Sequence, residues 1–378
     1  MEITRHNLLG LTRNELNDFV LSIGEPRYRG GQIFQWLYAK RRTDFQSMTD
    51  LGKAFRARLE TTATIQGLSV VTARESRRDG TTKFLFALSD GSKIESVLIP
   101  PAAALEEDHQ RLTLCISTQV GCPLDCRFCA TATMGFTRNL TVGELVDQVL
   151  SAQRATRKRI TNIVFMGMGE PLMNYTNVMK AVEIITGGIG IAARRLTIST
   201  AGRADKIRQM GDERRRAKLA ISLHSVVDET RTTLMPINKK FDIEALGSAI
   251  AHYYAATKQR VTYEYIFFDG VNDTDHEVAR LIKFARRVPC KINVIPFHSI
   301  TFTGPTGIAA SLRPSPRSEE IVARLRAYDL TVMVRGNAGD DIEAACGQLA
   351  VNADRRKRCP GSFDSIPSYT LQSESTPG

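Results

Sequence analysis

The sequence of 378 residues has few of the features that mark membrane, secreted or disordered proteins. It contains no uncharged apolar run near the roughly 20 residues that span a bilayer. Its first residues lack the long apolar core of a signal peptide. Hydrophobic residues make up 42% of the chain and charged residues 24%, which excludes a disordered or collagen-like protein. We therefore expect a globular, cytoplasmic protein with no membrane partner.

Cysteine is also scarce, because seven unevenly placed residues are too few for the disulfide framework of a secreted protein. Three of them, Cys122, Cys126 and Cys129, form the tight pattern C-x3-C-x2-C. Clustered thiols in a reducing compartment more often serve metal or redox chemistry than structure. Chance grouping of three buried cysteines is the weaker explanation in a chain with so few.

Negative charge is in deficit, since 51 Lys and Arg residues exceed 40 Asp and Glu residues for a net charge of +11. Basic residues gather at 154–159 and at 214–218. Each group alone is typical of a solvated helix end, but the overall excess favours a partner that carries phosphate. A nucleic-acid substrate is the hypothesis that this charge supports.

The chain from residue 112 onward alternates short β-branched runs with longer helical patterns, which predicts an α/β fold with a parallel sheet. A Rossmann-type sheet is the competing fold, but no G-x-G-x-x-G follows the first predicted strand. We expect a partial (βα)6 TIM-like barrel, with functional groups at the carboxyl ends of the strands. The predicted strands are Leu112–Thr118, Asn162–Gly167, Arg195–Thr200, Lys218–Leu223, Arg260–Ile266 and Lys291–Pro296.

Three regions are expected along the chain. Residues 1–100 form a small α+β accessory domain that carries basic residues and is expected to bind RNA. Residues 101–350 form the barrel core and end in a catalytic loop. Residues 351–378 are basic and rich in Pro, Ser and Thr without apolar periodicity, which predicts a disordered tail. Within the core, Thr141 and Glu144 form a capping box that predicts a helix start.

The cysteine triplet has two chemical interpretations. A structural zinc site normally takes four ligands, often from two C-x2-C pairs, and no second pair is present here. A four-iron cluster held by three cysteines leaves one iron open to a small-molecule ligand, unlike the four-cysteine electron carriers. The triplet therefore favours a 4Fe-4S cluster that does chemistry.

A C-x3-C-x2-C motif directly after the first strand of a βα barrel resembles the radical S-adenosylmethionine (SAM) superfamily, in which SAM chelates the open iron. Further segments resemble the RlmN/Cfr family of RNA adenosine methyltransferases, and this resemblance runs from about residue 5 to residue 350. These segments are NIVFMGMGEPLMN (162–174), RRLTISTAG (194–202), LAISLHS (219–225), LMPINKK (234–240), VTYEYIFFDGVND (261–273) and GDDIEAACGQL (339–349).

The family resemblance implies three catalytic residues. Cys346 matches the cysteine that first receives a methyl group from one SAM molecule, and whose methyl then loses hydrogen to a 5'-deoxyadenosyl radical from a second. Cys115 matches the cysteine that releases the methylated base by forming a disulfide bond with the first. Glu95 matches the carboxylate that removes the remaining proton.

The same resemblance implies the residues that bind SAM, and these follow successive strands as a barrel requires. His298 departs from the family, which commonly has Asn at that position, and a histidine there can still contact the adenosyl group. The segment before Cys346 also lacks a basic pair that is common in the family. The implied SAM contacts are Gly169, Glu170, Ser199, Ser222, Leu223, His224 and His298.

The implied reaction is methylation of carbon 2 of adenosine in 23S rRNA and in tRNA beside the anticodon. That carbon is electron-poor, so a radical route through a cofactor suits it better than ordinary SAM methylation. The resemblance further implies a monomer served by flavodoxin or ferredoxin as electron donor. Two alternatives remain open, a carbon 8 methyltransferase of the Cfr type and a zinc-stabilised RNA-binding protein without activity. A sulfur-inserting enzyme is disfavoured, because only Cys290 and Cys359 remain for a second cluster.

Overall fold

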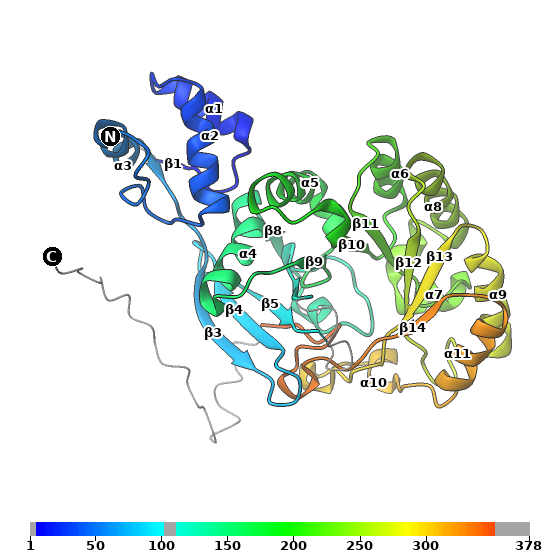
Figure 1. The fold of residues 1–378 in the computed structure, drawn as a ribbon. Coiled ribbons are helices and arrows are strands. Elements are labelled where there is room, and N and C mark those ends of the chain that lie inside the picture. Colours follow the sequence, from blue (N-terminus) through cyan, green and yellow to red (C-terminus); the bar gives the residue numbers. More distant parts are fainter. Residues whose placement is uncertain (1–4, 102–110, 352–378) are drawn as a thin grey trace, which may run out of the picture.

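The computed structural model describes residues 5–101 and 111–351 (Figure 1). All of the predicted tail except residue 351, and with it Cys359, lies outside the described residues. A ten-stranded sheet runs through the molecule in the order β14-β13-β12-β11-β10-β9-β6-β5-β4-β3. None of the described helices is both long enough and apolar enough to cross a membrane.

All six predicted strands are present and parallel, so the predicted α/β fold class is confirmed. A short strand, β14, extends the parallel run at one edge and was not predicted. Its three residues, Val332–Val334, are all apolar, but Met333 and Val334 are exposed because β14 is a short strand at the edge of the sheet. The parallel strands are β6 (Thr113–Cys115), β9 (Asn162–Phe165), β10 (Leu196–Thr200), β11 (Lys218–Ser222), β12 (Val261–Tyr265), β13 (Cys290–Val294) and β14 (Val332–Val334).

Three antiparallel strands continue the same sheet beyond β6. They are β3 (Ser69–Glu75), β4 (Thr82–Ala87) and β5 (Lys93–Ile99), and β5 pairs with β6 through Val97 and Cys115. β5 lies between β4 and β6, and its central residues, Ile94–Leu98, are buried on both faces of the sheet. The boundary expected at residue 100 therefore falls between two strands that pair with each other.

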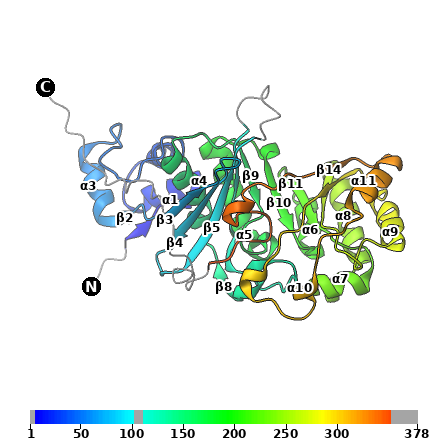
Figure 2. The ribbon, with the colours of Figure 1, turned by 90° about the horizontal axis from the view of Figure 1, so that it is seen from below.

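The segment before β3 is largely helical and lies at one end of the molecule, opposite α9 and α11 (Figures 1 and 2). An ion pair between Glu15 and Lys180 joins it to α5, and Asp147 of α4 accepts a hydrogen bond of 2.6 Å from the Leu68 amide. Its elements are β1 (His6–Asn7), α1 (Arg13–Ser22), α2 (Tyr28–Phe34), η1 (Gln35–Ala39), α3 (Lys53–Thr62) and β2 (Ala63–Thr64).

Helices connect the parallel strands. The capping box of Thr141 and Glu144 starts α4 as predicted, since each residue bonds the other's backbone amide. The α-helices of the core are α4 (Val142–Thr156), α5 (Tyr175–Ile184), α6 (Ala204–Asp212), α7 (Asp228–Leu234), α8 (Ile243–Thr257), α9 (Asp275–Ala285), α10 (Ile308–Ser311) and α11 (Ser318–Ala327). Shorter turns are η3 (Ala130–Met134), η4 (Pro171–Asn174), η5 (Ile185–Ile189), η6 (Ala193–Arg195), η7 (Pro236–Lys239), η8 (Thr301–Thr303) and η9 (Asp340–Ile342).

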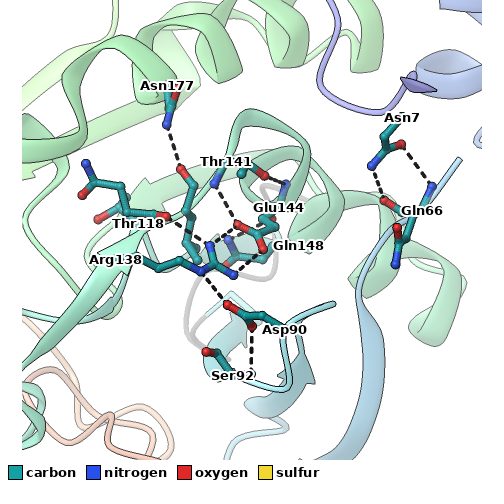
Figure 3. Close-up of polar contacts among 12 residues, drawn as sticks. Asn7, Gln66, Asp90, Ser92, Thr118, Arg138, Thr141, Glu144, Gln148 and Asn177 are labelled. Atoms are coloured by element: carbon teal, nitrogen blue, oxygen red, sulfur yellow. Dashed lines mark hydrogen bonds and ion pairs between the residues drawn. The ribbon is translucent and has the colours of Figure 1, made fainter. Parts of the chain in front are cut away.

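A two-stranded hairpin of β7 (Gln119–Gly121) and β8 (Phe136–Asn139) follows β6. Figure 3 shows Arg138 of β8 between Asp90, 2.7 Å away, and Glu144 at the start of α4, 2.8 Å away. The Arg138 guanidinium lowers the pKa of Asp90 to about 2. This arginine therefore fixes the hairpin against both the antiparallel strands and α4.

Candidate active site

The cysteine triplet lies in the loop that the β7–β8 hairpin closes. Gly121 has φ +73°, and a Cβ at this position would lie 1.9 Å from the Gly135 carbonyl oxygen. The Cys122 amide donates to that same oxygen at 2.8 Å. Only glycine allows this close approach, so Gly121 closes the base of the loop and sets where the three half-buried cysteines emerge.

The three thiols lie close enough together for their charges to affect one another. Burial raises the pKa of Cys122 to about 12 and also raises the pKa values of Cys126 and Cys129. The charges of Cys129 and Cys122 raise the pKa of Cys126 further. Within the part of the chain that the structure describes, no three His, Cys, Asp or Glu side chains are placed to hold one metal ion. Three thiols on one short loop are the donor set that an iron–sulfur cluster takes from a protein, and binding would displace their protons.

The residues predicted to bind SAM lie at the carboxyl ends of the parallel strands. Gly169 and Glu170 follow β9, Ser199 lies in β10, and Ser222 ends β11. The buried Glu170 carboxylate accepts hydrogen bonds from the backbone amides of Leu172, at 2.9 Å, and Ala201, at 2.8 Å. Burial raises the pKa of Glu170 despite these bonds. The carboxylate therefore bridges the ends of β9 and β10, at the rim where a ligand would lie.

His224 follows β11 and is almost fully buried. Its Nδ1 accepts a hydrogen bond from the Ile266 amide at 3.1 Å, and burial lowers its pKa to about 3. The neutral ring therefore carries its proton on Nε2. Its edge meets the ring of Phe128, in the cysteine loop, with centroids 4.5 Å apart. His224 thus supports the cysteine loop from the strand side.

Arg231 of α7 is a site residue that sequence reasoning missed. It is fully buried and donates to the carbonyl oxygens of Leu223, at 3.1 Å, and Ala201, at 2.6 Å. Burial lowers its pKa to about 10. The arginine thereby joins the ends of β10 and β11. Its local sequence, DETRTT, is typical of an exposed helix and carries no signal of burial.

The two predicted working cysteines come together in the structure. Cys346 lies in residues 343–350, called the Cys346 loop below, and it lines with Cys115 of β6 a cavity of about 40 Å³. Both thiols are free, so the predicted disulfide is not formed here. Burial raises the pKa of Cys115 to about 12. The Cys346 loop also contacts the end of the cysteine triplet, since the Ala130 amide, next to Cys129, donates to the Gly347 carbonyl oxygen at 2.7 Å.

Arg335, at the end of β14, is a second residue that the sequence did not reveal. Its Nη1 donates to the Cys346 sulfur at 3.3 Å. The negative charges of Cys346, Glu264 and Cys115 raise the pKa of this arginine, with Cys346 the largest cause. Arg335 therefore holds the Cys346 sulfur in place through a hydrogen bond from a charged donor.

Glu95 and His298 both reach the carboxyl-terminal segment. The Glu95 carboxylate on β5 is buried, and it lies 3.2 Å from the Lys83 ammonium and accepts from the Ala350 amide at 3.1 Å. His298 Nδ1 lies 2.9 Å from a carboxylate oxygen of Asp340, and the His298 side chain lines the cavity beside Cys346.

Known proteins are similar in sequence to this chain over most of its length. Residues 6–65 match the family described as Ribosomal RNA large subunit methyltransferase N-terminal domain, and residues 116–282 match the Radical SAM superfamily. The chain is 44% identical to the Dual-specificity RNA methyltransferase RlmN of Geobacter sulfurreducens, with 94% of each chain covered. It is 42% identical to the protein of the same name in Syntrophotalea carbinolica, over 92% of this chain and 90% of that one.

A solved structure shows the same fold. The crystal structure of a radical SAM methyltransferase from Sphaerobacter thermophilus superposes with a TM-score of 0.82 at 40% identity. The match covers 91% of this chain and 99% of that chain.

Proposed function

The chain belongs to the RlmN family of radical SAM RNA methyltransferases, and from this premise we propose that it methylates carbon 2 of adenosine in 23S rRNA and in tRNA beside the anticodon. The observation that carries the proposal is the shared cavity of Cys115 and Cys346 beside the cysteine triplet. A mechanism through a methylated cysteine requires two thiols near one cofactor site. The protein is proposed to act as a cytoplasmic monomer that receives electrons from flavodoxin or ferredoxin.

The cofactor site is assigned to Cys122, Cys126 and Cys129, which would hold a 4Fe-4S cluster, with SAM along the strand ends from Gly169 to His224. Together the cluster and SAM supply a radical that abstracts hydrogen. His298 is assigned a contact with the adenosyl group of SAM, because it lines the cavity beside the Cys346 loop. Glu170 and Arg231 hold the ends of β9, β10 and β11 together, which keeps this rim rigid.

Cys346 is the proposed methyl acceptor. Its sulfur would take the methyl group from a SAM molecule bound at the strand ends, forming a sulfur–carbon bond as the sulfonium carbon–sulfur bond breaks and S-adenosylhomocysteine leaves. Arg335 supports this step, because its guanidinium donates to the Cys346 sulfur. The cavity that both thiols line admits a few water molecules.

Cys115 and Glu95 act after the carbon of the Cys346 methyl group has bonded to the base. The Cys115 thiolate would attack the Cys346 sulfur to form a disulfide, and the electron pair of the broken sulfur–carbon bond would stay on the product carbon, which takes a proton to complete the methyl group. The single electron left over from radical addition would return to the cofactor site that supplied the radical. The Glu95 carboxylate takes the proton from carbon 2 of the adenine ring. Residues on three different elements, β5, β6 and the Cys346 loop, thus act on one base.

Regiochemistry is tested by anaerobic incubation of the iron-reconstituted protein with SAM, a reductant and unmodified 23S rRNA. Mass spectrometry of the released nucleosides is expected to show 2-methyladenosine. 8-Methyladenosine would assign the protein to the Cfr type of reaction. Colourless, zinc-containing protein without SAM cleavage would instead identify a zinc-stabilised RNA-binding protein. Parallel incubation with unmodified tRNA tests the second substrate.

A further inference from the structure

Two neighbouring antiparallel strands carry opposite charges that face each other away from water. The Lys83 ammonium of β4 lies 3.2 Å from the Glu95 carboxylate of β5, and their side chains are only 10% and 8% exposed. Burying two charges costs free energy. Their mutual attraction offsets this cost only when further hydrogen bonds satisfy both groups. The other partners of this pair therefore indicate what it does.

Both members of the pair also bind the Cys346 loop. The Lys83 ammonium donates to the Glu343 carbonyl oxygen at 3.2 Å, before Cys346 in the chain. The Glu95 carboxylate accepts from the Ala350 amide at 3.1 Å, after Cys346. One ion pair thus holds the loop on both sides of the thiol. Hydrogen bonds to charged groups are stronger than those between neutral groups, so the two bonds hold the loop firmly.

This held position closes the space in which a base would react. The cavity that Cys115 and Cys346 line is about 40 Å³, which admits a few water molecules and no nucleobase. The proposed reaction requires an adenine ring beside Cys346. The Cys346 loop must therefore move before RNA can react.

We propose that Lys83 is a positioning residue, which forms with Glu95 a latch that holds the Cys346 loop closed and opens to admit the RNA base. The latch is argued from the contacts above, while its opening for RNA rests on the proposed function. Lys83 acts through the loop and is assigned no contact with the substrate. Because the latch depends on both charges, loss of either one should loosen the loop without unfolding the sheet.

The test uses the full-length, iron-reconstituted protein without SAM or RNA, so its outcome does not depend on methylation. Hydrogen exchange is followed in peptides that cover the Cys346 loop, and N-ethylmaleimide labelling of Cys346 is followed by mass spectrometry. Lys83→Met is expected to accelerate both several-fold. Lys83→Arg, which keeps the charge and the donors, should restore rates near those of the unaltered protein. Lys180→Met is the matched control, because Lys180 pairs with Glu15 on the outer helices.

Unchanged hydrogen exchange and labelling rates in folded Lys83→Met would overturn the latch. Rates in folded Lys83→Arg as high as those in Lys83→Met would also overturn it. If Lys83→Met does not fold, Glu95→Gln replaces it, because the amide oxygen still accepts from Ala350 while the charge is gone. Faster exchange in Glu95→Gln supports the latch, and unchanged exchange refutes it. The nucleoside assay reports on methylation separately, so failure of either idea is recognised independently.

Discussion

Acidification should destabilise the iron-free protein through His224. Its pKa is lowered from 6.5 to about 3 by burial, so the unfolded chain binds a proton in a range where the folded protein does not. Stability that is present above pH 6.5 is therefore lost progressively as the pH falls toward 3. Between pH 7.5 and 5.5 the linkage amounts to about 1.4 kcal/mol.

The perturbation that isolates this contribution is His224→Asn. Asparagine does not titrate in this range, tolerates the left-handed backbone of this position, φ +55°, and offers an oxygen to the Ile266 amide. Urea unfolding at pH 7.5 and 5.5 measures the free energy of unfolding of each protein. The unaltered protein is expected to lose about 1.4 kcal/mol more than the variant over this interval.

The unaltered protein must be compared with His224→Asn because other groups also change protonation in this pH range. Burial raises the pKa values of Glu170 and Glu264, and raised carboxyl pKa values stabilise the folded state as the pH falls. These contributions are common to both proteins and cancel in the difference. His252→Asn is the control, because it removes a histidine that solvent reaches and leaves His224 in place. Identical pH dependence in the unaltered protein and His224→Asn would refute the buried neutral imidazole.

Cys346→Ala should bind iron normally and form no methylated nucleoside, and methylation by this variant would contradict a mechanism through a methylated Cys346. Cys115→Ala should accumulate protein that is covalently attached to RNA, which denaturing gels would show. Gly121→Ala should lower the iron content per chain severalfold, because its Cβ would lie 1.9 Å from the Gly135 carbonyl oxygen; full iron content by colorimetric assay would contradict this. Arg335→Met should slow methyl transfer to Cys346 about tenfold, which corresponds to one charge-assisted hydrogen bond of roughly 1.5 kcal/mol. An unchanged rate of S-adenosylhomocysteine release would show that the guanidinium does not support this step.

Local features of this fold could be read from the sequence. The helix start at Thr141 and Glu144 depends on two residues three positions apart, and the structure shows the predicted capping box. The six parallel strands were predicted from short β-branched runs that alternate with helical patterns along the chain. The cysteine triplet was visible because its spacing is compact. The roles of Cys346, Cys115 and Glu95 came only from family resemblance, and these assignments remain predictions.

Only the tertiary structure decided which distant residues meet. Cys346 and Cys115 share a cavity because the chain returns across the sheet after β14. Lys83, Arg231 and Arg335 look like surface residues in the sequence, yet packing places each of them beside the site. Interactions within one turn of helix or one strand leave a periodic pattern in the sequence. Contacts between elements hundreds of residues apart leave none, so the network around Cys346 emerges only once the chain is folded.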